Sequence, residues 1–177
     1  MVKVKGGVRN VSRTSKSYQN RLREIEILRA SGKYSSVDMP KNGTGWVAIE
    51  KSSKKRYAHE IEAAFYMAKA GYKVILKDEA GRMTTPDGFL FSFAYEQKTV
   101  ETRNESKRDR AIEHAYKKLD KGAHVDVVVI YDRYGNYVRK DIEDGILRFE
   151  RETGYYRFRG FVVISKTGKI SVFRHNL

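Results

Sequence analysis

The stretch TPDGFLFSFAYEQK, residues 85–98, carries two acidic side chains and a lysine on what its pattern predicts to be two short strands. Successive side chains point to opposite faces of a strand, so Glu96 and Lys98 are expected on the same face. Asp87 lies on the adjacent predicted strand and is expected to join them. Two carboxylates beside an ammonium group can hold a divalent metal and a phosphate. The aromatic side chains of the opposite phase are expected on the buried side: Phe89, Phe91, Phe93 and Tyr95.

The elements around this stretch predict an α/β fold, with a mixed central sheet flanked by helices. Helices are expected over 17–31, 56–71, 104–121 and 140–152, and strands over 46–49, 72–79, 88–92, 94–100, 124–131, 157–164 and 170–174. Residues 1–16 are interpreted as a flexible basic leader, and residues 32–45 as a loop or linker. The chain is therefore divided into a basic N-terminal arm with one helix, over 1–45, and an α/β domain over 46–177.

The composition indicates a polyanionic partner. The chain has 177 residues and a net charge of +14, which favours nucleic acid first and an acidic membrane surface second. Residues 1–58 are the most basic part, with 14 Lys and Arg against 4 Asp and Glu. The absence of cysteine excludes disulfides and thiolate metal sites. Because no apolar run approaches about 18 residues, no membrane span is expected.

The chemistry that these side chains can support is phosphodiester hydrolysis. Such a reaction uses a metal to activate water and to neutralise charge on the phosphate. Asp87 and Glu96 are suitable oxygen ligands for Mg²⁺, with Mn²⁺ or Zn²⁺ as alternatives. Lys98 can orient the water or stabilise the transition state. Glu60, on the preceding helix, can supply another ligand, whereas Glu62 points about 200° away from it on an ideal helix.

The residues Glu60, Pro86-Asp87 and Glu96-Gln97-Lys98 resemble the signature of the PD-(D/E)XK nuclease superfamily. The order of helix, three strands, helix and strand is similar to the common core of that superfamily. Within it, residues 60–71 resemble the first helix of the C-terminal nuclease domains of bacterial contact-dependent growth inhibition toxins. Segments within 106–118 and 161–170 are similar to the same domains. The resemblance covers about residues 56–174.

This resemblance implies a metal-dependent nuclease, which in the toxin branch often cleaves tRNA. The roles it implies are metal ligation by Asp87 and Glu96, catalysis by Lys98 and assistance by Glu60. It also implies an acidic immunity protein as a partner. The expected site of action is the cytoplasm, with delivery from another cell as part of a larger toxin left open.

Basic and aromatic side chains elsewhere are candidates for contacts with nucleic acid. The basic face of the helix expected over 104–121 offers phosphate contacts, although such a face is ordinarily just solvated. The candidates are Arg103, Lys107, Arg108 and Arg110. A second group mixes rings with guanidinium groups, which suits stacking on unpaired bases but equally suits packing. Its members are Tyr155, Tyr156, Arg157 and Arg159.

Three functions stay open from the sequence. The first is a metal-dependent endonuclease that acts on RNA, with tRNA favoured, as a bacterial toxin. The second is a DNA endonuclease of the same fold, of the restriction or mobile-element type. The third is a non-catalytic basic domain that binds nucleic acid. The sequence decides neither the cleaved bond nor the oligomeric state.

Overall fold

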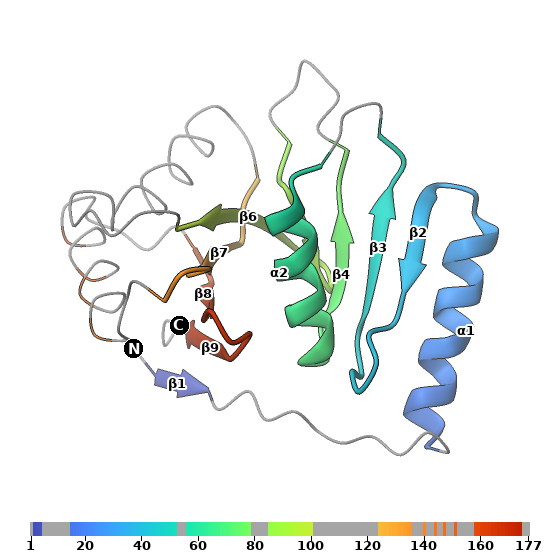
Figure 1. The fold of residues 1–177 in the computed structure, drawn as a ribbon, viewed down its shortest axis with the longest axis horizontal. Helices are drawn as coiled ribbons and strands as arrows, with labels where there is room; N and C mark the ends of the chain where they lie inside the picture. Colours follow the sequence, from blue (N-terminus) through green and yellow to red (C-terminus); the bar gives the residue numbers. More distant parts are fainter. Residues whose placement is uncertain are drawn as a thin grey trace.

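The computed structural model describes residues 2–4, 15–52, 56–78, 85–100, 124–135 and 158–174, together with residues 140, 144, 147 and 151. Within these residues, nine strands form one sheet and two helices lie against it (Figure 1). The helices are α1 (Lys16–Ala30) and α2 (Ala58–Lys69). The strands are β1 (Val2–Val4), β2 (Tyr34–Asp38), β3 (Trp46–Glu50), β4 (Lys73–Leu76), β5 (Gly88–Leu90), β6 (Phe93–Thr99), β7 (Val127–Tyr131), β8 (Gly160–Ile164) and β9 (Ile170–Arg174).

The sheet is mixed, which confirms the expected α/β fold. Its strand order is β1-β9-β8-β7-β6-β5-β4-β3-β2. Strands β3 and β4 are parallel, as are β6, β7 and β8. The antiparallel hairpin of β5 and β6 joins these two parallel blocks. The hairpin that carries the acidic side chains therefore lies in the middle of the sheet.

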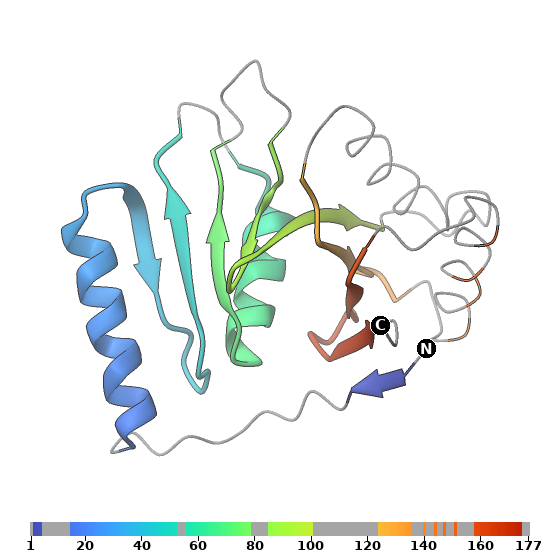
Figure 2. The same cartoon turned by 180° about the vertical axis from the view of Figure 1, so that it is seen from behind.

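The two helices cover opposite faces of the sheet. Ile25 of α1 packs against Trp46 and Ala48 of β3. The alternate residue, Val47, packs instead in the core cluster that contains α2. The buried side of α2 consists mainly of alanine, so its backbone can approach the strands closely. Seen from behind, α2 lies on the far side of β3 and β4 (Figure 2).

The sequence patterns located both helices well. In α1, the Ser15 hydroxyl accepts a hydrogen bond from the Tyr18 amide at 3.2 Å, which caps the start of the helix. Gly32 follows the end of α1 with a φ of +67°, and Gly71 follows the end of α2 with a φ of +99°. A residue without Cβ adopts this left-handed conformation without steric strain. Among the described residues, no helix is long and apolar enough to span a membrane.

The expected loop over 32–45 is wrong for residues 34–38, which form β2. This strand pairs antiparallel with β3, and only Tyr34 and Val37 among its side chains pack against the apolar cluster of α1 and β3. The pairing comes from the neighbouring strand rather than from an apolar pattern, so the local sequence did not signal it. Residues 2–4, expected within a flexible leader, form β1 and pair with β9. The expected domain boundary at residue 45 therefore falls between two paired strands of one sheet.

The expected burial of the aromatic side chains is correct for Tyr95 and wrong for two of its neighbours. Phe91 is 48% exposed and Phe93 is 38% exposed, whereas Tyr95 is fully buried. The chain reverses at Phe91 and Ser92, so these rings lie at the end of the sheet and beyond its core. The helix expected over 104–121 lies outside the described residues. Of the helix expected over 140–152, residues 140, 144, 147 and 151 are described, and they are helical.

Gly45 allows α2 and the start of β3 to approach each other. A Cβ atom at this position would lie 1.9 Å from the carbonyl oxygen of Tyr72 and 2.7 Å from that of Ala68. We therefore expect Gly45→Ala to lower the free energy of unfolding by about 2–3 kcal/mol, as overpacked sites do. Urea denaturation measures this loss. Gly32→Asn is the control, because its position is open and asparagine tolerates a positive φ. Equal urea midpoints for the two variants would contradict a steric requirement for glycine at position 45.

Candidate active site

Asp87 occupies the point where β4, β5 and β6 meet. Its carbonyl oxygen accepts a hydrogen bond from the Lys77 amide at 3.0 Å. Its carboxylate Oδ2 accepts one from the Gln97 amide of β6 at 2.6 Å. The side chain thus takes the place of a backbone partner just where the β5–β6 ladder ends at Gly88. The carboxylate is held, almost buried, against the backbone between Glu96 and Lys98.

Glu96 and Lys98 form an ion pair on one face of β6, as their spacing predicted. Lys98 Nζ lies 3.3 Å from Glu96 Oε1. Glu96 is fully buried, whereas the Lys98 side chain is 30% exposed. A buried carboxylate is costly unless a cation accompanies it, and the Lys98 ammonium group supplies that cation. The exposed part of Lys98 remains accessible to a substrate.

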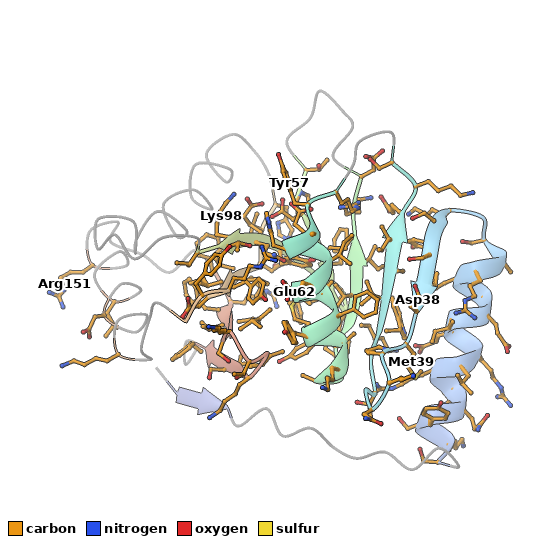
Figure 3. The ribbon with its side chains drawn as sticks, in the orientation of Figure 1. Asp38, Met39, Tyr57, Glu62, Lys98 and Arg151 are labelled. Atoms are coloured by element: carbon orange, nitrogen blue, oxygen red, sulfur yellow. The ribbon has the colours of Figure 1, made fainter. Side chains whose placement is uncertain are left out.

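Glu60 reaches the same region from the first turn of α2. Burial raises the pKa of its carboxyl, and the negative charge of Asp87 raises it further; Arg56 and Lys98 act in the opposite direction. The Gln97 side chain links β6 to this turn by donating to the His59 carbonyl at 3.4 Å. Lys98, the next residue of β6, therefore lies near the start of α2 and Tyr57 (Figure 3). The structure therefore brings Glu60 to Asp87 and Lys98.

Tyr95 is a member of this cluster that the sequence patterns assigned only to the core. Its hydroxyl is buried and has no hydrogen-bond partner among the described residues. Burial and the charges of Asp87, Glu60 and Glu96 raise its pKa well above the ordinary value, so it stays protonated and can donate a hydrogen bond. The ring packs on Gly88, where a Cβ atom would lie 2.7 Å from it. A glycine directly opposite a tyrosine was the signal that could have located it.

Other candidates lie elsewhere or outside the described residues. The Glu62 carboxylate is directed to the segment that follows β7, where Arg133 Nε lies 3.2 Å from it. The His59 ring stacks on Tyr57, with centroids 5.3 Å apart. Of the aromatic and guanidinium group, Arg159 alone is described. The candidates that lie outside the described residues are Arg103, Lys107, Arg108, Arg110, Tyr155, Tyr156 and Arg157.

The carboxylates of this cluster fit a hard divalent cation that keeps much of its own water. Asp87 directly precedes β5 and Glu96 lies on the neighbouring strand β6, and both can supply oxygen ligands. Burial raises the pKa of Glu60 most, and the negative charge of Asp87 adds to it; a cation would relieve this second contribution. Within the described part of the chain, no group of three or more His, Cys, Asp or Glu side chains converges as a metal site. Two protein ligands suit Mg²⁺, which usually retains several water molecules.

Comparison with known proteins shows a shared fold. No protein-family model and no curated protein matches the chain. A chain of the CdiA-CT/CdiI toxin and immunity complex from Burkholderia pseudomallei is similar in structure, with a TM-score of 0.53 and 14% sequence identity. The match covers 72% of this chain and 98% of that chain. At this identity the likeness concerns the fold, and the activity has to be argued from the site.

Glu60 makes stability depend on pH. A raised pKa means that the folded protein holds this proton more tightly than the unfolded chain. The resulting stability is present below the ordinary pKa of a glutamate, about 4.3, and is lost as the pH rises through the raised value. We therefore expect Glu60→Gln to unfold at a higher temperature than the parent at pH 7, with the difference closing near pH 4. Glu26→Gln, exposed on α1, should show no such pH-dependent gain; a parent more stable than Glu60→Gln at pH 7 would refute the assignment.

Proposed function

We propose that this protein is a metal-dependent endonuclease that hydrolyses phosphodiester bonds in RNA, with tRNA as the favoured substrate, and that it acts as a bacterial toxin. The observation that carries the proposal is the Lys98–Glu96 ion pair beside the Asp87 carboxylate, at the mouth of the β5–β6 hairpin. The net charge of +14 supports a polyanionic substrate. The fold likeness to a toxin and immunity complex supports the toxin role.

Each side chain has a role in this proposal. Asp87 and Glu96 would hold the metal, Mg²⁺ first and Mn²⁺ or Zn²⁺ as alternatives. When bound, the metal would activate water and neutralise charge on the phosphate. Lys98, positioned by Glu96, stabilises the charge that develops on a phosphate oxygen. Glu60, whose pKa is raised by burial and by Asp87, is suited to accept a proton from the attacking water. The protonated Tyr95 hydroxyl supplies a neutral donor among these carboxylates.

The proposal includes an acidic immunity protein as the partner of this chain. A protein with a net charge of +14 attracts an acidic surface, which speeds and orients the encounter. The similar chain comes from a complex of a toxin with its immunity protein. The site of action would be the cytoplasm of a target cell, reached as part of a larger toxin.

A cleavage assay on total tRNA and plasmid DNA tests the function. We expect the parent to cut tRNA with Mg²⁺, Mn²⁺ or Zn²⁺ and not in EDTA. Lys98→Ala should slow cleavage by about a hundredfold or more, because it removes a charge that stabilises the transition state. Asp87→Asn and Glu96→Gln should lose comparable activity. Lys69→Ala removes the same charge at the exposed far end of α2 and should cleave like the parent.

The outcomes of this assay separate the competing functions. Cleavage of plasmid DNA alone would identify a DNA endonuclease. Salt-sensitive retention of nucleic acid without product under every metal would identify a binding domain. Parental activity in Lys98→Ala or Asp87→Asn would show that the site lies elsewhere.

Metal binding is testable without any substrate. A cation that binds the folded protein alone stabilises it by about 2.7 kcal/mol when its concentration is a hundred times the Kd. We expect Mg²⁺ or Mn²⁺ to raise the thermal unfolding midpoint of the parent, and this rise to disappear in Asp87→Asn and Glu96→Gln. Glu26→Gln should respond like the parent. An equal rise in all four proteins would place metal binding outside the cluster.

A further inference from the structure

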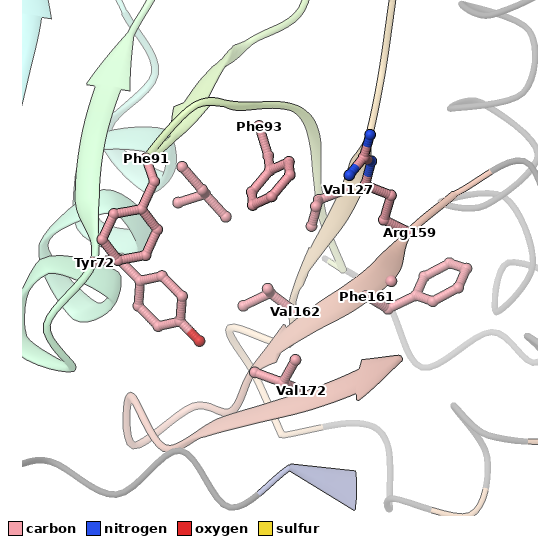
Figure 4. A pocket seen from close by; sticks show the side chains of 10 residues that line it. Tyr72, Phe91, Phe93, Val127, Arg159, Phe161, Val162 and Val172 are labelled. Atoms are coloured by element: carbon pink, nitrogen blue, oxygen red, sulfur yellow. The ribbon is translucent and has the colours of Figure 1, made fainter. Parts of the chain in front are cut away.

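A hollow lies at the end of β6 away from Lys98. Phe93 begins this strand and Lys98 follows five positions later, which corresponds to about 17 Å along the strand. The hollow has a volume of about 300 Å³. Its walls include Tyr72, Phe91, Phe93, Arg159, Val162 and Val172 (Figure 4). We call it the distal pocket, because the cluster of Asp87, Glu96 and Lys98 contributes nothing to its walls.

Aromatic rings form one side of the distal pocket and remain partly open to solvent. Phe91 and Phe93 are 48% and 38% exposed. The Tyr72 ring lies 5.7 Å from that of Phe91, measured between centroids. Phe91 has a φ of +55°, a left-handed conformation that is unfavourable for a bulky side chain. The first position of this two-residue turn suits glycine better, so the ring is presented at the expense of local strain.

Arg159 supplies the polar side of the distal pocket. Its guanidinium carbon lies 5.2 Å from the centroid of the Phe93 ring. Its Nε lies 3.3 Å from Oδ1 of Asp126. The other oxygen of Asp126 accepts a hydrogen bond from the Ala94 amide at 3.0 Å, so the carboxylate is itself fixed. Arg159 is therefore held over the ring while its side chain stays 66% exposed.

We propose that the distal pocket binds one unpaired nucleotide of the nucleic-acid substrate, with the base on the Phe91 and Phe93 rings and the phosphate on Arg159. Every base has a flat face that stacks on aromatic rings, and arginine binds phosphate through its planar group. A volume of about 300 Å³ is at the small end of ligand pockets, which suits one nucleotide. A paired base inside a duplex would not be available for such stacking.

The bound nucleotide would lie away from the cleaved bond, by about 17 Å along β6. The alternation along β6 places Phe93 on the face of Tyr95 and Gln97, opposite to Glu96 and Lys98. The distal pocket would thus select substrates with an unpaired segment some nucleotides away from the cleavage position. This inference rests on the proposed function, because it takes nucleic acid to be the substrate.

Binding of two labelled RNA probes tests the inference. One probe is a single-stranded decanucleotide and the other is the same sequence in a duplex, both measured by fluorescence anisotropy in EDTA. We expect Phe91→Gly to weaken binding of the single strand about fivefold or more, the effect of losing one stacked base, and to leave the duplex unchanged. Arg159→Gln should weaken the single strand more than the duplex. Phe91→Gly should fold at least as stably as the parent, because glycine accepts the positive φ.

Matched controls remove similar groups from the exposed side of α1. Ile27→Ser removes an exposed apolar side chain, and Arg23→Gln removes one positive charge. Ile27→Ser should bind both probes like the parent, and Arg23→Gln should affect both equally. The inference is overturned if Phe91→Gly and Arg159→Gln bind the single strand like these controls, or if they weaken both probes equally.

The two proposals can fail separately. Suppose that the parent cleaves no nucleic acid but prefers the single strand, and that Phe91→Gly loses this preference. The endonuclease proposal would then be refuted, and the distal-pocket proposal would be supported. A parent that cleaves tRNA, with binding insensitive to Phe91→Gly, would sink the distal pocket alone.

Discussion

The hydrogen bond from the Gln97 amide to the Asp87 carboxylate organises the centre of this protein. It takes the place of the next backbone hydrogen bond between β5 and β6, so the two strands separate beyond Gly88. The Asp87 carbonyl is paired with Lys77 beyond β4 at the same time. Asp87 thus links the two parallel blocks of the sheet and places its carboxylate where β5 and β6 separate. The side chains that are proposed to act on a phosphate lie around this joint.

Two carboxylates near this end of the sheet, those of Glu50 and Glu60, lie in different electrostatic environments. Glu50 has Lys33 and Lys77 within 3.0 Å and 3.1 Å and also accepts a hydrogen bond from the Asp78 amide, so its pKa is lowered in spite of its burial. The pKa of Glu60 is raised by burial and by the negative charge of Asp87. The first carboxylate stabilises the fold, whereas the second is kept in an unfavourable environment. Such a contrast is typical of a structural group beside a functional one.

A fold can be shared by sequences that are only 14% identical, because the sheet order and the helix positions depend on patterns of burial more than on particular residues. The architecture supports the toxin proposal through likeness alone. The case for nuclease chemistry comes from Asp87, Glu96 and Lys98, which meet in this chain for reasons of local register. The immunity partner and the RNA substrate are proposals about how this chemistry is used.

The sequence by itself determined the features that depend on short-range periodicity. The period of two placed Glu96 and Lys98 on one face, and the helical period located α1 and α2 to within two residues at each end, because neighbouring residues dictate these properties. Tertiary structure alone decided the rest. The mostly polar strand β2 forms because β3 offers it an edge to pair with. The turn at Phe91 contains no glycine or asparagine that would have indicated it in the sequence. Tyr95 lies near Asp87 and Glu60, and Arg159 lies over the Phe93 ring, because the register of the sheet brings distant segments together. No local sequence pattern encodes that register.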